Sequence, residues 1–311
     1  MIDLIIPYYN NKTGLITTLQ SILFPDMFYI TVVDDCSTEY PTIFPLRVNQ
    51  VLRYNINHGP GYARQFGLDR THNEWVMFLD TGDIFMSRSS FDQIKAATEE
   101  HSDADIISFP YLYKDEIPNE LSNRMHGKIY KRKFLEKCNI TFAPESSYMN
   151  EDIGFNRACR MCTDNIIYKH LPIIKWVEDE NSLTQKDGNI ALYRDQCRAL
   201  SLVSIHAINI AKRNKVSVRE EINQISLSLY YWFIRAVADR PEYIQDAWTG
   251  AKIFYDYFKD EINPNTLLLG NAKLKKCLAY RKKISFPINI LRFAHDIQIY
   301  DEVPKQYKGG D

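Results

Sequence analysis

Short apolar runs alternate with segments of helical periodicity over the first hundred residues. The run from Trp75 to Leu79 is continuously apolar, as expected of a strand that is covered on both faces. Leu15, Leu19 and Ile22 recur on one face of a predicted helix. Because alternating strands and helices build parallel sheets, the pattern predicts an α/β fold with a mostly parallel, doubly wound sheet. The predicted strands cover residues 2–6, 29–33, 51–54, 75–79, 105–109, 127–130 and 166–177.

The alternation stops near Leu192, and only helical periodicity continues, as far as about Lys259. The segment Ser217–Glu220 has the S/T-x-x-E pattern of a capping box, which predicts that a helix begins there. We therefore predict two domains: an α/β domain over residues 1–190 and a mostly helical C-terminal extension over residues 191–311, for acceptor binding or oligomerisation.

The composition is typical of a soluble globular protein, with 45% hydrophobic and 25% charged residues. The net charge of −1 gives no reason to expect a polyanionic partner. No apolar run approaches the roughly 18 residues that span a bilayer, and no basic segment precedes an apolar core at the N-terminus. We expect no transmembrane segment and a cytoplasmic protein whose six cysteines are reduced.

One segment departs from this balanced charge. Between Lys273 and Arg292 there are seven basic residues and no acidic residue. A solvated helix face explains this pattern, and so does a docking surface for an anionic acceptor such as a phosphate-bearing glycan, a membrane surface or nucleic acid. Tyr280, Phe286 and Phe293 lie among and beside these residues and can stack on sugars or bases, or belong to a core. Both interpretations stay open.

Polar motifs follow three of the predicted strands. They are Pro7–Asn10, Asp34–Ser37 and Asp80–Asp83, and a glycine-rich turn, Asn57–Gly67, leads into a helix. Ligands of open α/β sheets bind beyond the carboxyl ends of the strands, so we expect these motifs to lie together. Asp80 and Asp83 can hold a hard divalent cation, which usually carries substrate phosphates. We expect the Asp83 carboxylate to be exposed in its turn.

This ordered set of motifs resembles the inverting GT-A glycosyltransferases of family 2, and the resemblance covers about residues 1–185. The N-terminal region of that family approximates ω-P-x-Y-N, V-D-D-x-S, N-x-G-x-x-x-A-R-N-x-G and D-x-x-D, where ω is apolar. The pair Glu151–Asp152 and the segment Asn181–Thr184 match two further family motifs. Any one of these motifs alone is weak, but their order and spacing together are specific.

Two residues depart from the family pattern. Gln65 stands where the family usually has Asn, and Gly82 stands where many members have a further Asp. The second departure leaves Asp80 and Asp83 as the candidate metal ligands.

The resemblance implies a GT-A fold and a metal-dependent, inverting transfer of a sugar from a nucleotide-sugar donor, with UDP the expected nucleotide. The acceptor would be a hydroxyl group, by family analogy on a surface polysaccharide or another glycan, with an anionic acceptor as one alternative. The residues that it assigns to donor binding are Pro7, Tyr9, Asp34, Asp35, Gly61, Arg64 and Asp80.

Within this set, the resemblance implies that Asp35 accepts the imide N–H of uracil, that Asp34 orients the loop, and that Arg64 reaches the diphosphate or the base. The planar guanidinium of an arginine suits phosphate oxygens. Mn²⁺ or Mg²⁺ held by Asp80 and Asp83 would stabilise the leaving diphosphate as a Lewis acid.

Asp152 is the predicted general base, and Glu151 is the alternative. Asn150 is a predicted helix N-cap, which places both acids in the first turn, where the helix dipole favours a carboxylate. Helix capping alone would also explain the pair. The histidines have no pairing that marks a metal site, so we expect His58, His126 and His170 to be structural.

Three other functions fit parts of the pattern. One is a nucleotidyltransferase that attacks phosphorus, and another is a nucleotide-binding protein that has lost catalysis. The third is a family 2 enzyme that glycosylates modified DNA, which the basic segment would serve. The four retained acids of the two predicted catalytic motifs argue against lost catalysis. Release of UDP, rather than pyrophosphate, separates a glycosyltransferase from a nucleotidyltransferase.

Overall fold

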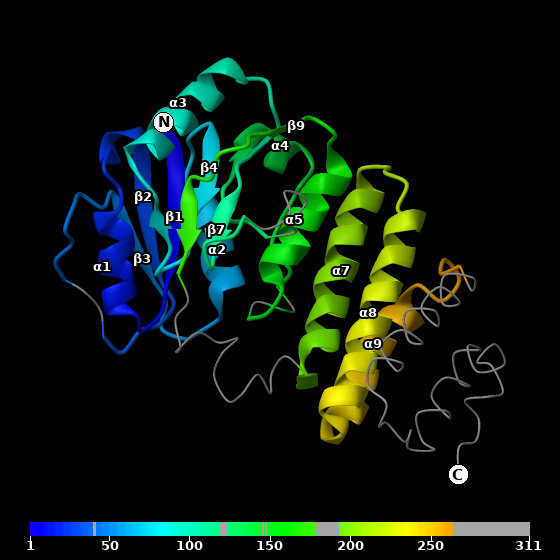
Figure 1. Cartoon of the computed structure of the whole chain (residues 1–311). Helices are drawn as coiled ribbons and strands as arrows, with labels where there is room; N and C mark the ends of the chain where they lie inside the picture. Colours follow the sequence, from blue (N-terminus) through cyan, green and yellow to red (C-terminus); the bar gives the residue numbers. More distant parts are fainter. Residues whose placement is uncertain (40–41, 118–123, 145, 147, 178–192, 264–311) are drawn as a thin grey trace, which may run out of the picture. The chain divides into compact units, whose positions relative to one another are not determined.

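The protein, seen as a computed structural model, is described here over residues 1–39, 42–117, 124–144, 146, 148–177 and 193–263 (Figure 1). It divides into two compact units: Met1–Gln185 with Asn209–Val216, and Lys186–Ile208 with Ser217–Asp311. The predicted domain limit between residues 190 and 191 stays a prediction. The basic segment Lys273–Arg292 and the motif Asn181–Thr184 lie outside the described residues.

A seven-stranded sheet forms the centre of the first unit (Figure 1). In spatial order its strands are β3 (Gln50–Arg53), β2 (Phe28–Asp34), β1 (Ile2–Tyr8), β4 (Trp75–Phe78), β8 (Lys128–Lys131), β6 (Ile106–Ser108) and β9 (Ile166–Tyr168). Only β8 runs antiparallel to its neighbours, and the other pairs are parallel. The predicted α/β fold with a mostly parallel sheet is confirmed.

A second, three-stranded sheet has the order β5 (Ile84–Phe85), β10 (Ile174–Trp176) and β7 (Tyr111–Tyr113). The predicted strand over residues 166–177 is therefore two strands in different sheets. Pro172 lies between them, and a proline cannot donate a hydrogen bond to a ladder. Strand β10 pairs with β5 antiparallel and with β7 parallel, which brings residues distant in sequence to the end of β4.

Helices cover both faces of the central sheet. Helices α1 (Lys12–Gln20) and α3 (Arg88–Glu100) bury Leu15, Leu19, Phe91 and Ile94 against alternate residues of β1 and β4. On the other face lie α2 (Pro60–Leu68) and α5 (Glu151–Cys162). Phe155 of α5 packs on Phe78 and on Phe142, with ring centroids 5.7 and 4.3 Å apart. This double cover explains the continuous apolar run in β4.

The remaining helices are α4 (Arg132–Lys137), α7 (Gln196–Arg213), α8 (Arg219–Asp239) and α9 (Ile244–Tyr257). In the second unit, α8 and α9 pack through Phe233 and Trp248, whose ring centroids lie 5.5 Å apart. The predicted capping box at Ser217 is wrong, because α8 is capped at Val218 without a side-chain hydrogen bond. Within the described residues, no helix has both the length and the apolarity needed to cross a membrane.

Candidate active site

The first part of the site is a turn that follows β4. The Asp83 N–H donates to the Asp80 carbonyl over 3.0 Å, which closes a four-residue turn. Gly82 occupies its third position with φ +107°, a conformation that residues with a Cβ rarely adopt. The Gly82 N–H also donates to Thr18 Oγ1 of α1 over 2.9 Å. The two carboxylates are thus held at the end of the sheet by a fixed backbone.

A second turn brings His126 to the same place. The Lys128 N–H donates to the Met125 carbonyl over 3.1 Å, and Gly127 takes the third position with φ +72°. A Cβ at Gly127 would lie 2.5 Å from the Phe109 carbonyl oxygen, so the turn also needs the small residue for space. Gly127 therefore specifies the turn that positions the His126 imidazole.

Aromatic rings of the three-stranded sheet hold the imidazole. The His126 ring lies 4.9 Å from Tyr111 and 5.4 Å from Trp176, measured between centroids. Trp176 in turn stacks on Tyr113 at 4.3 Å. The imidazole thus has little freedom to leave the carboxylates that it faces.

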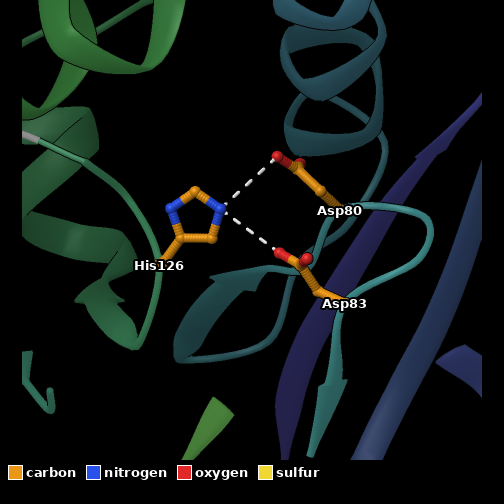
Figure 2. Close-up of side chains that lie close together, drawn as sticks. All are labelled: Asp80, Asp83 and His126. Carbon is orange, nitrogen blue, oxygen red and sulfur yellow. Dashed lines mark ion pairs between the residues drawn. The ribbon is translucent and has the colours of Figure 1, made fainter. Parts of the chain in front are cut away.

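His126, Asp80 and Asp83 form a cluster in which one ligand atom from each lies within 4.8 Å of the others (Figure 2). His126 Nε2 is 3.2 Å from Asp83 Oδ2 and 3.9 Å from Asp80 Oδ2. The expected exposure of Asp83 is wrong, because its side chain is only 3% exposed and its Oδ1 accepts the Val177 N–H. Among the described residues, none gives a hydrogen bond to Asp83 Oδ2.

The electrostatics of this cluster are strongly coupled. Burial raises the pKa of Asp83, His126 opposes that rise, and the charge of Asp80 adds to it. Burial alone would lower the pKa of His126, but the two carboxylates outweigh it and raise that pKa. Desolvation also acts on Asp80, yet the adjacent Arg64 lowers the pKa of this carboxyl. The cluster therefore places two carboxylates and an imidazole close enough together to hold a metal ion.

Arg64 of α2 links this cluster to α5. Its NH2 nitrogen lies 2.5 Å from Asp80 Oδ1, and its NH1 nitrogen lies 2.8 Å from Glu151 Oε1. The side chain is 4% exposed, and burial, which lowers its pKa, is outweighed by the two carboxylates, which raise it. Both terminal nitrogens thus already bind internal carboxylates, so the predicted contact with a donor diphosphate stays a prediction.

Glu151 and Asp152 are the first two residues of α5, at the positive end of its dipole. Burial raises the pKa of Glu151, and Arg64 opposes that rise. Asp152 instead has Oδ2 3.3 Å from NH1 of Arg124, whose side chain is 41% exposed. The predicted N-cap bond of Asn150 is absent, because that residue is left-handed with φ 60° and its side chain makes no capping bond.

Asp35, directly after β2, is also buried, and each of its carboxylate oxygens accepts a backbone hydrogen bond. Its Oδ1 accepts the His58 N–H over 2.7 Å, and its Oδ2 accepts the Gly59 N–H over 2.6 Å. Burial raises the pKa of Asp35, and the two backbone hydrogen bonds lower it. The neighbouring Asp34 accepts the Ser37 N–H over 2.9 Å, which fixes the loop after the strand.

The other predicted donor residues line the same end of the sheet. The Pro7 carbonyl accepts Thr81 Oγ1 over 2.6 Å, which ties β1 to the carboxylate turn. Tyr9, directly after β1, is 50% exposed, and Gly61 is buried in the first turn of α2. Their contacts with a donor stay predictions.

The structure brings the predicted metal and base residues together and adds two that the sequence pattern did not single out. The sequence pattern predicts a structural His126 and assigns no role to Arg124. Both precede β8, and the one local signal for their role is Gly127, which marks the tight turn. Of the other histidines, His58 packs on Tyr62 at 4.4 Å and has no part in the cluster.

Residues 3–151 match the family described as Glycosyl transferase family 2. An uncharacterised glycosyltransferase of Haemophilus influenzae is 29% identical over 127 residues, or 39% of this chain and 41% of that protein. The poly(ribitol-phosphate) β-N-acetylglucosaminyltransferase TarS of Staphylococcus aureus is 31% identical over 178 residues, or 48% of this chain and 30% of TarS. The chain thus covers less than half the length of either relative.

The crystal structure of S. aureus TarS residues 1–349 in complex with UDP-GlcNAc has the same fold. It superposes with a TM-score of 0.65 at 19% sequence identity, over 99% of this chain and 91% of that one. This similarity confirms the GT-A fold that the motifs predicted.

Proposed function

We propose that the protein transfers a sugar from a UDP-sugar to a hydroxyl of a surface glycan, with inversion, because residues 3–151 match the Glycosyl transferase family 2. The observation that carries this proposal is the cluster itself. Asp80, Asp83 and His126 could together hold a metal ion, and Asp152 lies in the first turn of α5. The metal cluster would bind the leaving group and Asp152 would act as the base, and a single displacement requires both.

The residues fit a divalent metal. Asp83 Oδ2 is buried without a hydrogen bond from the described residues and faces the imidazole nitrogen of His126. Asp80, Asp83 and His126 would hold the ion, which would supply Lewis-acid stabilisation of the diphosphate. Mg²⁺ prefers an all-oxygen shell, so the imidazole favours Mn²⁺. His126 would then be the ligand that compensates for Gly82 in the motif.

The transfer itself is a single displacement at the anomeric carbon. The acceptor oxygen forms a bond to that carbon, and the bond from the carbon to the diphosphate oxygen breaks with its electron pair leaving on the diphosphate. The hydroxyl proton passes to a carboxylate of the protein. Asp35 would fix the base of the nucleotide, since each of its oxygens retains acceptor capacity beyond its backbone bond.

The charge pairs favour Asp152 over Glu151 as the base. Glu151 is locked to the buried Arg64 at 2.8 Å, so proton transfer to it would disrupt an internal ion pair. Asp152 contacts Arg124 over 3.3 Å, and the Arg124 side chain is 41% exposed. Glu151 would serve to hold Arg64 and, through it, Asp80.

The proposed acceptor class is a polysaccharide of the cell surface, in keeping with the name of the S. aureus relative. The proposed location in the cytoplasm rests on the sequence pattern. A modified-DNA acceptor depends on the segment Lys273–Arg292, outside the described residues.

A donor panel tests the proposal. Purified protein is incubated with UDP-sugars and GDP-sugars, with Mn²⁺, Mg²⁺ or EDTA, and the released nucleotide is identified. Release of UDP that requires the metal, together with an inverted anomeric product on an acceptor, is expected. Release of pyrophosphate would instead indicate a nucleotidyltransferase. Donor binding without turnover in any acceptor mixture would indicate a protein that has lost catalysis.

A further inference from the structure

Side-chain contacts join two segments of the first unit that are distant in the sequence. Residues 57–65 comprise the glycine-rich turn and the first part of α2, and residues 142–151 lead into the acids of α5. The buried ion pair of Arg64 and Glu151 ties the C-terminal ends of these segments together. The segment that leads to the predicted base is therefore attached to the segment that carries predicted donor residues.

Gln65, which departs from the family pattern, makes a second contact of this kind. Its Oε1 accepts the Phe142 N–H over 2.9 Å, and its Nε2 donates to Asp69 Oδ1 of the same helix turn over 2.7 Å. Phe142 also stacks on Phe155 in the core. The beginning of residues 142–151 is thus fixed by packing as well as by a hydrogen bond.

Tyr148 contacts the turn that holds Asp35. Its hydroxyl donates to the Asn57 carbonyl over 2.8 Å, and the Asn57 side chain donates to the Asp35 carbonyl over 3.1 Å. The next two N–H groups of this turn donate to the Asp35 carboxylate. Burial raises the pKa of Tyr148, and the charge of Asp35 adds to that rise, as expected for a hydroxyl near this carboxylate. One turn therefore contacts both the proposed nucleobase acceptor and the segment that leads to the predicted base.

The hydroxyl contact matters because packing holds Tyr148 only in part. Tyr148 is 52% exposed, whereas Phe142 at the start of the segment is 3% exposed. Three residues separate Tyr148 from Asp152, so a shift of the tyrosine is passed on to the first turn of α5. The hydrogen bond to Asn57 therefore helps to set where the chain enters that helix.

We propose that Tyr148 is a positioning residue, which holds Asp152 at the place relative to the bound nucleotide that sugar transfer requires. The proposal rests on the glycosyltransferase function proposed above, with Asp152 as the base. A base acts only within hydrogen-bond reach of the acceptor hydroxyl, so a small displacement lowers the rate of transfer. Donor binding does not depend on that reach and is left unchanged.

The test removes the hydroxyl of Tyr148 and keeps its ring. The wild type, Tyr148→Phe, Asp152→Asn and the double variant are compared, using the UDP-sugar and the acceptor that give the fastest transfer by the wild type. The kcat and the donor KM are measured, and the Kd of UDP is measured by calorimetry in Mn²⁺. The control is Tyr168→Phe, at a tyrosine that is 37% exposed on the edge strand β9.

Tyr148→Phe should lower kcat by about two- to tenfold, the range that corresponds to one hydrogen bond. The donor KM and the Kd of UDP should stay at their wild-type values. In the Asp152→Asn background, Tyr148→Phe should have no further effect, because the base that it positions is already lost. Tyr168→Phe should match the wild type in every measurement.

Three results would overturn the proposal. A rise in the Kd of UDP that accounts for the loss of kcat/KM would mean that Tyr148 binds the nucleotide. The same fold-loss of kcat with and without Asp152→Asn would mean that Tyr148 supports the fold and not the base. A wild-type kcat in Tyr148→Phe would mean that the contact with Asn57 is dispensable. Failure of the wild type to release UDP from any UDP-sugar would instead be a failure of the proposed function.

Discussion

Asp35 and Asp83 are both buried carboxylates at the strand ends of one sheet, yet their surroundings are opposite. Asp35 is 3% exposed and accepts a backbone N–H on each oxygen. Asp83 is 2% exposed, but its Oδ2 has no hydrogen bond from the described residues and faces His126. The first carboxylate is held by two backbone N–H groups, whereas Oδ2 of the second faces the imidazole of His126.

The contrast separates an acid whose burial is offset by backbone hydrogen bonds from an acid whose burial is offset by a neighbouring side chain. A buried charge without a partner costs several kcal/mol and persists only where another gain offsets the cost. The loop from His58 to Gly59 supplies that gain at Asp35. At Asp83 the His126 imidazole and the Val177 N–H offset the burial only in part, since the pKa of this carboxyl stays raised, so substitutions at the two sites should affect stability and activity in opposite ways.

The largest expected effect is that of Asp83→Asn. It keeps the shape but removes a ligand charge, so metal-dependent turnover should fall by about 10³-fold or more, the scale of several kcal/mol of Lewis-acid stabilisation. Its stability should be equal to or above that of the wild type, because a buried charge is removed. Turnover is measured over a Mn²⁺ series, with thermal shifts to report Mn²⁺ binding separately. Wild-type turnover and Mn²⁺ dependence in this variant would contradict the metal assignment.

Asp152→Asn should reduce turnover by about 10²-fold or more, the range of a lost general base, with little change in the donor KM. Asp152 would act at the acceptor hydroxyl and Asp35 at the nucleotide base, so Asp152→Asn should leave binding of the donor nucleotide intact. Glu151→Gln is the matched control at the adjacent position. If Glu151→Gln alone showed this pattern, the base would be Glu151, and equal losses in donor affinity and rate would indicate a donor-binding role.

Lys128→Met should show how much the buried charge of Lys128, near Asp152, lowers the stability of the protein. Burial lowers the pKa of the Lys128 amine from 10.5 to about 8. Between about pH 8 and 10.5 the unfolded chain holds the proton that the folded chain has lost, so wild-type stability rises with pH across this window. At pH 7 the buried charge of Lys128 lowers the free energy of unfolding by on the order of 3 kcal/mol. The hydrogen bond from Lys128 to the Arg124 carbonyl offsets part of this loss.

Urea unfolding at pH 7 and pH 10 tests this. At pH 7, Lys128→Met should have a higher free energy of unfolding than the wild type, and the difference between the two proteins should be smaller at pH 10. Lys133→Met, at an exposed lysine of α4, is the control. Identical behaviour of the two variants would show that burial of Lys128 is not the cause.

Asp35→Asn has the smallest expected effect on the cluster of Asp80, Asp83 and His126, and it tests the other acid of the comparison. The amide that replaces one oxygen cannot accept a backbone N–H, so one of the two bonds from His58 and Gly59 is lost. We expect a loss of about 1–3 kcal/mol in the free energy of unfolding, measured in urea. A stability equal to that of the wild type, with Asp83→Asn destabilised instead, would reverse the assignment of the two acids.

The sequence by itself determined the parts of this protein that are local. The buried run of β4, the turn with Gly82 and the first turn of α5 depend on periodicity, glycine conformation and the helix dipole, which neighbouring residues set. The family motifs supplied the order of the acids from Asp35 to Asp152. These predictions hold in the structure because short-range patterns specify short-range backbone.

Only the tertiary structure decided which charges meet. His126 reaches Asp83 because β8 lies beside β4 in antiparallel register, a pairing of segments separated by about fifty residues. Arg64 was expected to face the donor, but Asp80 and Glu151 converge on it from two elements. Asp83 was expected in solvent, but it is buried, with the Val177 N–H on Oδ1 and His126 beside Oδ2. Side-chain pairing across a sheet depends on register and on which strands are neighbours, and neither is written in the spacing of residues along the chain.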